Sequence, residues 1–228
     1  MFPRNSLSRL SAAAIATLAL AAACSDKKEA EATPPATPVS LASAPPTDEI
    51  ATPATIADFT LSDQNGQAHE LYKMTDAKAI VMVLQGVGCP IVQQLTPDIK
   101  DLQAAYEPKG VKFLMLNANN QDTPAMIANE AKNFEIKMPI LKDVGQKVAE
   151  PLGVVRTAET FVIQPGTWKI LYHGPLSDRL TYGRAKAKAD NNYAQDAIEA
   201  ALTGKAAPVS HAMTDGCLID FPARTAKG

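Results

Sequence analysis

The sequence predicts an α/β domain in which helices cover a central mixed β-sheet, preceded by an N-terminal β-hairpin. Short continuous apolar runs alternate along the chain with segments of helical periodicity, as buried strands and their connecting helices do. In addition, an Asn-Gly step at 65–66 and a Pro-Gly step at 165–166 each separate two apolar segments, which is typical of antiparallel strand pairs.

The first elements follow from these patterns. We expect the hairpin strands at 57–61 and 68–72, because they flank the Asn-Gly step. Residues 79–84 are apolar throughout and predict a buried central strand. Apolar residues then recur every three to four positions over 90–106, which predicts a helix with Pro97 as a kinking residue.

The middle of the chain continues the alternation. Residues 111–116 predict a second buried strand, and Thr123 followed by a proline predicts a capped helix that runs to residue 134. A short strand at 138–141 and a short helix at 144–150 are expected to follow.

The last elements are a strand pair and a helix. Strands at 160–163 and 169–172 flank the Pro-Gly turn. Asn192 and Gln195 have the spacing of a capping box and predict the start of a final helix, which Gly204 is suited to end.

Composition excludes several classes of protein. The 228 residues include 22 Lys plus Arg and 24 Asp plus Glu, a net charge of -2, so no basic surface indicates a nucleic-acid partner. No apolar run reaches the roughly 18 residues of a membrane-spanning helix. The 20% charged and 46% hydrophobic residues are typical of a globular domain.

The N-terminus has the pattern of a secretory signal. Arg4 and Arg9 precede a run of small and apolar residues that is too short to span a bilayer. The run ends in three alanines before Cys24, which resembles the lipobox of bacterial lipoproteins and predicts a lipid on Cys24; an ordinary secretory signal cut nearby is the alternative. Ser25 resembles the outer-membrane sorting pattern, so we expect a lipid anchor on the periplasmic side, with the outer membrane slightly favoured.

These patterns divide the chain into four parts. We expect a signal peptide at 1–23, a tether rich in proline and alanine at 24–54, a globular domain at 55–205, and a C-terminal tail at 206–228 that contains Cys217.

Cys89 is the strongest candidate for chemistry. It lies where a buried strand gives way to a helix, and free N–H groups and the helix dipole stabilise a thiolate at such a position. A buried, inert cysteine is the alternative. The three histidines are scattered and predict no zinc site, and we expect neither a metal nor another cofactor.

The strand-Cys-Pro-helix unit resembles the thioredoxin superfamily, and more specifically its redoxin branch of alkyl-hydroperoxide-reductase/thiol-specific-antioxidant (AhpC/TSA) proteins. The matching segments are 58–61, 88–91, 117–124 and 156–163. The resemblance covers roughly residues 55–220. It implies a three-layer α/β/α fold and a redox function.

The chain departs from this family at informative positions. Val92 stands where a thioredoxin has its second cysteine, and Gly86 stands where a peroxide-reducing member has Thr or Ser. Arg156 matches the position of the peroxidatic arginine. The resemblance also implies that Thr157 and Ala158 face the cysteine and, with Pro90, shape a substrate groove.

Cys217 is the second thiol that the resemblance makes relevant. Some members of this branch have a late Gly-Cys, matched here by 216–217, which implies a resolving thiol for Cys89. The C-terminal tail must then fold back over the start of the Cys89 helix. A static disulfide that only holds the tail is the alternative.

The favoured function is therefore a membrane-tethered, extracytoplasmic thiol–disulfide oxidoreductase whose partners are protein thiols and disulfides of the cell envelope. Three alternatives remain open: a thiol peroxidase that uses the same cysteine, a copper-binding or copper-delivery protein with His211, Met213 and Cys217 as ligands, and a redox-inactive thioredoxin-fold module.

Overall fold

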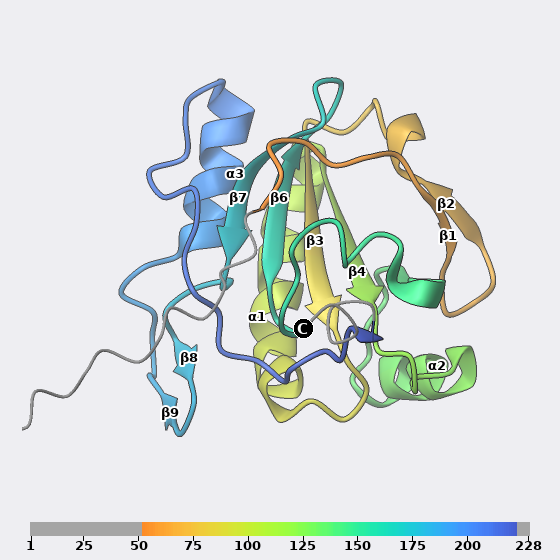
Figure 1. Cartoon of the computed structure of the whole chain (residues 1–228). Coiled ribbons are helices and arrows are strands. Elements are labelled where there is room, and N and C mark those ends of the chain that lie inside the picture. Colours follow the sequence, from red (N-terminus) through yellow and green to blue (C-terminus); the bar gives the residue numbers. More distant parts are fainter. Residues whose placement is uncertain (1–51, 223–228) are drawn as a thin grey trace, which may run out of the picture. The chain divides into compact units, whose positions relative to one another are not determined.

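The computed structural model describes residues 52–222 (Figure 1). The expected signal peptide, Cys24 and nearly all of the expected tether lie outside the described residues. Within 52–222, no helix combines the length and the apolar character needed to cross a membrane.

A five-stranded mixed sheet forms the centre of the domain, with the strand order β5-β4-β3-β6-β7. Its strands are β3 (Ala79–Gln85), β4 (Val111–Asn117), β5 (Ile140–Lys142), β6 (Thr160–Gln164) and β7 (Lys169–Gly174). The pairs β3–β4 and β4–β5 are parallel, whereas β3–β6 and β6–β7 are antiparallel. All seven residues of β3 are buried, which confirms the central strand expected from its apolar run.

Alternate residues of the central strands supply the two sides of the core. On one side, Val81 and Val83 pack in a cluster that includes the buried faces of the helices α1 (Pro90–Tyr106), α2 (Pro124–Asn133) and α3 (Tyr193–Thr203). On the other side, Ile80 and Met82 pack in a cluster beneath the N-terminal segment and the turns of 144–154. The structure therefore confirms a thioredoxin-like arrangement in which a mixed sheet is covered on both faces.

The N-terminal hairpin is confirmed, with shorter strands than expected. β1 (Thr60–Ser62) and β2 (Ala68–Glu70) are antiparallel. The Asp63 carboxylate accepts the N–H groups of Asn65 and Gln67 and bonds His69, so the side chain of Asp63 organises the turn. Gly66 has a φ of 81°, a left-handed conformation that glycine adopts readily.

Two local expectations were wrong. The segment expected as a helix at 144–150 contains only a 3-10 turn at Val144–Gln146, because Gly145 has a φ of 73° and interrupts the α-helical path. The expected capping box of α3 is absent, since Asn192 makes no side-chain cap hydrogen bond. By contrast, the Thr123 hydroxyl accepts the N–H of Met126 and caps α2 as expected.

One strand pair has no sequence signal. β8 (Leu180–Thr181) and β9 (Arg184–Ala185) form a two-residue antiparallel ladder around a turn at 182–183. Both strands are too short and too polar to show alternation. This small hairpin matters because Tyr182, at its turn, contacts the C-terminal tail.

The C-terminal tail returns to the sheet and packs against it. Figure 1 shows the tail in blue, crossing the end of the sheet where β3 ends and α1 begins. It makes a bridge from His211 to His173 and another from Leu218 to Arg156. Ile219 and Phe221 are buried in the core cluster on the second side of the sheet, so residues up to 221 contribute to the folded domain.

Candidate active site

Cys89 lies at the N-cap of α1, where the sequence placed it. The preceding loop turns sharply at Gly88, which has a φ of 75°. Two carboxylates hold this loop: Asp122 accepts the N–H of Val87 at 2.9 Å, and Glu130 accepts the N–H of Gly88 at 3.1 Å. Only 3% of Cys89 is exposed. Pro90, the first residue of the helix, is exposed.

A network of buried polar side chains, not predicted from the sequence, supports this loop. Asp122 also accepts hydrogen bonds from Asn117 at 2.7 Å and Asn119 at 3.1 Å, and Asn117 donates to Gln85 at 2.8 Å. All four residues are buried. The available signal was the run of Asn and Asp directly after a buried strand, because buried polar groups there need partners.

Cys217 lies beside Cys89 although 128 positions separate them in the sequence. Their Sγ atoms are 2.6 Å apart, and both cysteines are free thiols in the structure. A disulfide has an S–S bond of about 2.05 Å, so a small movement of either side chain brings the sulfurs to bonding distance.

Main-chain pairing places Cys217 at this position. The Thr157 N–H donates to the Cys217 carbonyl at 2.9 Å, and the Ile219 N–H donates to the Val155 carbonyl at 3.0 Å. The tail thus lies as a short antiparallel strand against residues 155–157. The segment expected to line a substrate groove is covered here by the protein's own C-terminal tail.

The Thr157 side chain lies beside the cysteine pair and contacts both residues. Its Oγ1 is 3.1 Å from the Cys89 Sγ and accepts the Cys217 N–H at 2.9 Å. Two glycines make room for it. A Cβ at Gly86 would lie 2.8 Å from the Thr157 Cγ2, and a Cβ at Gly216 would lie 1.9 Å from the Thr157 carbonyl oxygen. The departure from the family at Gly86 therefore has a steric reason.

Arg156 and Tyr182 hold the peptide group before Cys217. Arg156 Nη1 donates to the Gly216 carbonyl at 3.1 Å and to the Tyr182 hydroxyl at 3.0 Å. The Tyr182 hydroxyl also donates to the Gly216 carbonyl and accepts the Gly216 N–H. The recorded side-chain hydrogen bonds of Arg156 thus go to the tail and to Tyr182.

Ala158 has an unusual backbone conformation. Its φ of 66° lies in the left-handed region, which L-residues with a Cβ seldom adopt. The Ala158 N–H donates to the Leu84 carbonyl at 2.7 Å, and only 2% of the residue is exposed. Ala158 therefore connects the facing loop to the end of β3 beside the cysteine.

The two thiols differ in acidity. Burial raises the pKa of Cys89, but hydrogen bonds from Cys217 and Thr157 and the N–H of Val92 outweigh burial, so the pKa of Cys89 lies below its ordinary value. Burial and the neighbouring Cys89 raise the pKa of Cys217 to about 11. Because the thiolate is the nucleophile, Cys89 is the better attacking sulfur.

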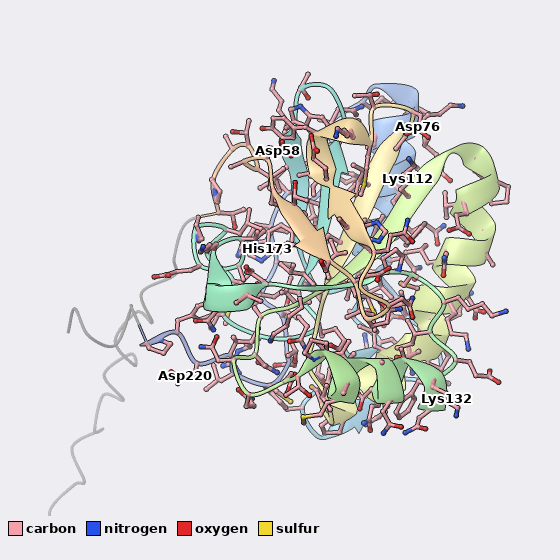
Figure 2. The ribbon with its side chains drawn as sticks, turned by 90° about the vertical axis from the view of Figure 1, so that its right-hand side faces the viewer. Asp58, Asp76, Lys112, Lys132, His173 and Asp220 are labelled. Atoms are coloured by element: carbon pink, nitrogen blue, oxygen red, sulfur yellow. The ribbon has the colours of Figure 1, made fainter. Side chains whose placement is uncertain are left out.

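A buried pair behind the site supports the facing loop. Glu159 bonds the His173 Nε2 at 2.8 Å, and its other oxygen accepts the N–H groups of Val155 and Arg156. Glu159 and His173 are each only 5% exposed. Figure 2 shows His173 within the fold, whereas Asp220 of the tail lies at the surface. Glu159 therefore orders the loop that carries Thr157.

The residues considered as copper ligands contact different groups, with Cys217 lying against Cys89. The His211 ring packs edge-on against His173, with 5.1 Å between ring centroids, and 84% of Met213 is exposed. Within residues 52–222, no three or more His, Cys, Asp or Glu side chains come together in a way that could hold a metal ion.

The fold and the two-cysteine site define a redoxin domain of the thioredoxin superfamily. Residues 53–176 match the AhpC/TSA family, and the chain belongs to that family. The resemblance inferred from the sequence is thus confirmed.

Relatives of known name agree with this class. The chain is 26% identical over 106 residues to the thiol-disulfide oxidoreductase ResA of Bacillus thuringiensis subsp. konkukian, and 28% identical over 116 residues to the ResA of Geobacillus thermodenitrificans. These matches cover 46% and 50% of this chain, and 60% and 64% of those proteins.

Solved structures show the same fold. The Sinorhizobium meliloti protein SMc02350 superposes with a TM-score of 0.68 at 25% identity, over 76% of this chain and 96% of that chain. The peroxidoxin BcpB of Mycobacterium tuberculosis superposes with a TM-score of 0.50 at 21% identity, over 67% of this chain and 96% of that chain. The second likeness concerns the fold alone.

Proposed function

We propose that this protein is a thiol–disulfide oxidoreductase in which Cys89 is the attacking thiol and Cys217 the resolving thiol. The observation that supports this proposal best is the 2.6 Å separation of two free sulfurs of unequal acidity. The names of the relatives and the shared family agree with it.

The reaction has two exchange steps. The Cys89 thiolate attacks a partner disulfide, forms a mixed disulfide, and releases one partner thiolate that takes up a proton. Cys217 then loses its proton and attacks the Cys89 Sγ, which breaks the mixed disulfide and releases the second partner thiolate. The partner gains two electrons and the Cys89–Cys217 disulfide forms, and a dithiol donor restores the reduced protein.

The site favours this reaction over peroxide reduction. Peroxide-reducing relatives have a hydroxyl residue at the position of Gly86, and a side chain there would overlap Thr157. Arg156 bonds the tail and Tyr182. A cavity of about 350 Å³ lies between α1 and the start of α3, and no cysteine lines it.

The test is turnover of an insulin disulfide by the full chain, with dithiothreitol as the electron donor. Cys89→Ser should abolish the reaction. Reduced Cys217→Ser, mixed with insulin after dithiothreitol has been removed, should leave a mixed disulfide that survives on a non-reducing gel. Wild-type turnover by Cys89→Ser would refute the proposal. A Cys89–Cys217 disulfide that never exchanges with a glutathione buffer would instead favour the static alternative.

We further propose that the domain is attached to the periplasmic side of the bacterial envelope through a lipid on Cys24, where it meets protein thiols and disulfides of the envelope. The lipobox-like residues before Cys24 and the proline-rich segment after it support this placement. Labelled palmitate should enter the wild-type protein and not Cys24→Ser, whereas equal labelling of both would contradict the lipid site.

A further inference from the structure

The Thr157 hydroxyl is the group that contacts both cysteines. Its Oγ1 lies 3.1 Å from the Cys89 Sγ and accepts the main-chain N–H of Cys217 at 2.9 Å. Thr157 is fully buried, so bulk water does not compete for these contacts. The same residue thus links the attacking sulfur to the docked C-terminal tail.

The position of the hydroxyl proton follows from its contacts. A threonine hydroxyl has one proton and two acceptor lone pairs. The Cys217 N–H occupies one lone pair, and within residues 52–222 the structure records the Cys89 Sγ as the only other partner of this oxygen. While Cys89 is a thiol, either atom of this contact can donate; once Cys89 ionises, only the hydroxyl can. A thiolate can only accept, so the contact becomes a charge-assisted hydrogen bond when Cys89 ionises.

We propose that the Thr157 hydroxyl is a donor that stabilises the Cys89 thiolate, and that docking of the C-terminal tail orients this hydroxyl. Thr157 is then a catalytic residue, because it touches the reacting sulfur. The inference rests on the proposed thiol–disulfide function and adds a second role for the tail: besides providing the resolving thiol, the tail activates the attacking thiol.

The steric arrangement supports this role. Gly86 leaves the space that the Thr157 methyl group fills, and Gly216 lets the tail come close enough for its main chain to reach the hydroxyl. Peroxide-reducing relatives have Thr or Ser in the Cys89 loop, at the position of Gly86. In this chain the hydroxyl that contacts the sulfur comes instead from the facing loop.

The first test compares Thr157→Val, which removes the hydroxyl and keeps the side-chain shape, with Thr157→Ser, which keeps the hydroxyl. Both variants are made in the full chain that also carries Cys217→Ser. Modification of Cys89 by iodoacetamide is measured as a function of pH. Mass spectrometry is used because it distinguishes the Cys89 peptide from the Cys24 peptide. Hydrogen bonds to charged groups contribute about 1.5–3 kcal/mol, so the valine variant should shift the midpoint upward by at least about one pH unit. Below the midpoint this is about a tenfold slower reaction. The serine variant should stay within about threefold of its parent, and an unchanged midpoint in a folded valine variant would overturn the proposal.

The second test addresses orientation by the tail and decides the matter if the valine variant fails to fold. Cys217→Ser and Cys217→Pro both lack the thiol, but only proline lacks the N–H that donates to Thr157. The proline variant should shift the Cys89 midpoint upward relative to the serine variant, and equal midpoints would contradict the orienting role. Both tests report thiol acidity, so they can fail while Cys89→Ser still abolishes insulin turnover, and the reverse also holds.

Discussion

Gly216 permits the closest approach between the C-terminal tail and the facing loop, and Gly216→Ala should therefore separate them. A Cβ at position 216 would lie 1.9 Å from the Thr157 carbonyl oxygen. Ordinary van der Waals contact for such a Cβ begins at 3.4 Å, so the tail must withdraw by about 1.5 Å. The obstacle is backbone rather than a flexible side chain, so a rotamer change cannot relieve it.

The withdrawal breaks the two hydrogen bonds that pair Thr157 with Cys217. Each is 2.9 Å long, and a retreat of about 1.5 Å takes both beyond hydrogen-bond range. At about 0.5–1.5 kcal/mol for each bond, the docked tail loses about 1–3 kcal/mol. Cys217 should then occupy its place beside Cys89 about fivefold to 150-fold less often, and resolution should slow by the same factor.

The assay is a single turnover of the reduced full chain, carrying Cys24→Ser so that Cys89 and Cys217 are its two thiols, with 5,5′-dithiobis(2-nitrobenzoate). The first release of thionitrobenzoate reports attack by one cysteine, and the second release reports resolution by the other. Gly216→Ala should slow the second release far more than the first. Thr214→Ala is the matched control in the same tail, because its buried hydroxyl has no recorded partner among the described residues. A second release by Gly216→Ala within twofold of wild type would refute this reasoning.

Three further predictions concern groups around the site. Tyr182→Phe removes the hydroxyl that bonds the peptide before the resolving thiol and should slow the second release about fivefold to tenfold, while Tyr106→Phe, which loses a hydroxyl bonded to a distant glutamate, should react as wild type. Iodoacetamide at pH 8 should modify Cys89 and spare Cys217, because a thiol with a pKa of about 11 is only roughly one part in a thousand ionised at that pH. Cys217 should react only as the pH rises toward 11. Equal labelling of the two cysteines at pH 8 would contradict the assigned acidities. Glu159→Ala leaves two main-chain N–H groups and a buried histidine without their partner. Urea denaturation should therefore show that the free energy of unfolding falls by about 3 kcal/mol. A fall of less than about 1 kcal/mol would show that Glu159 does not support the loop.

The elements predicted well are those whose signal is local. The apolar run at 79–84, the proline-started helix after Cys89 and the Thr123 cap each depend on residues within one turn or one strand. The failures have equally local causes. Gly145 adopts a left-handed conformation that composition does not reveal, and the hairpin around 182 is too short to show a period.

The sequence by itself determined that the chain has a mixed sheet covered by helices and that one cysteine begins a helix at the end of its central strand, because hydrophobic periodicity and helix-start residues are local properties. Only the tertiary structure decided what surrounds that sulfur. Cys217 reaches Cys89 through main-chain pairing of the tail with residues 155–157. Thr157 fits beside both cysteines because Gly86 leaves room for its methyl group and Gly216 leaves room for its carbonyl. This main-chain pairing and this steric fit join residues up to 128 positions apart in the sequence. They depend on how the whole chain folds, and no spacing along the sequence encodes them.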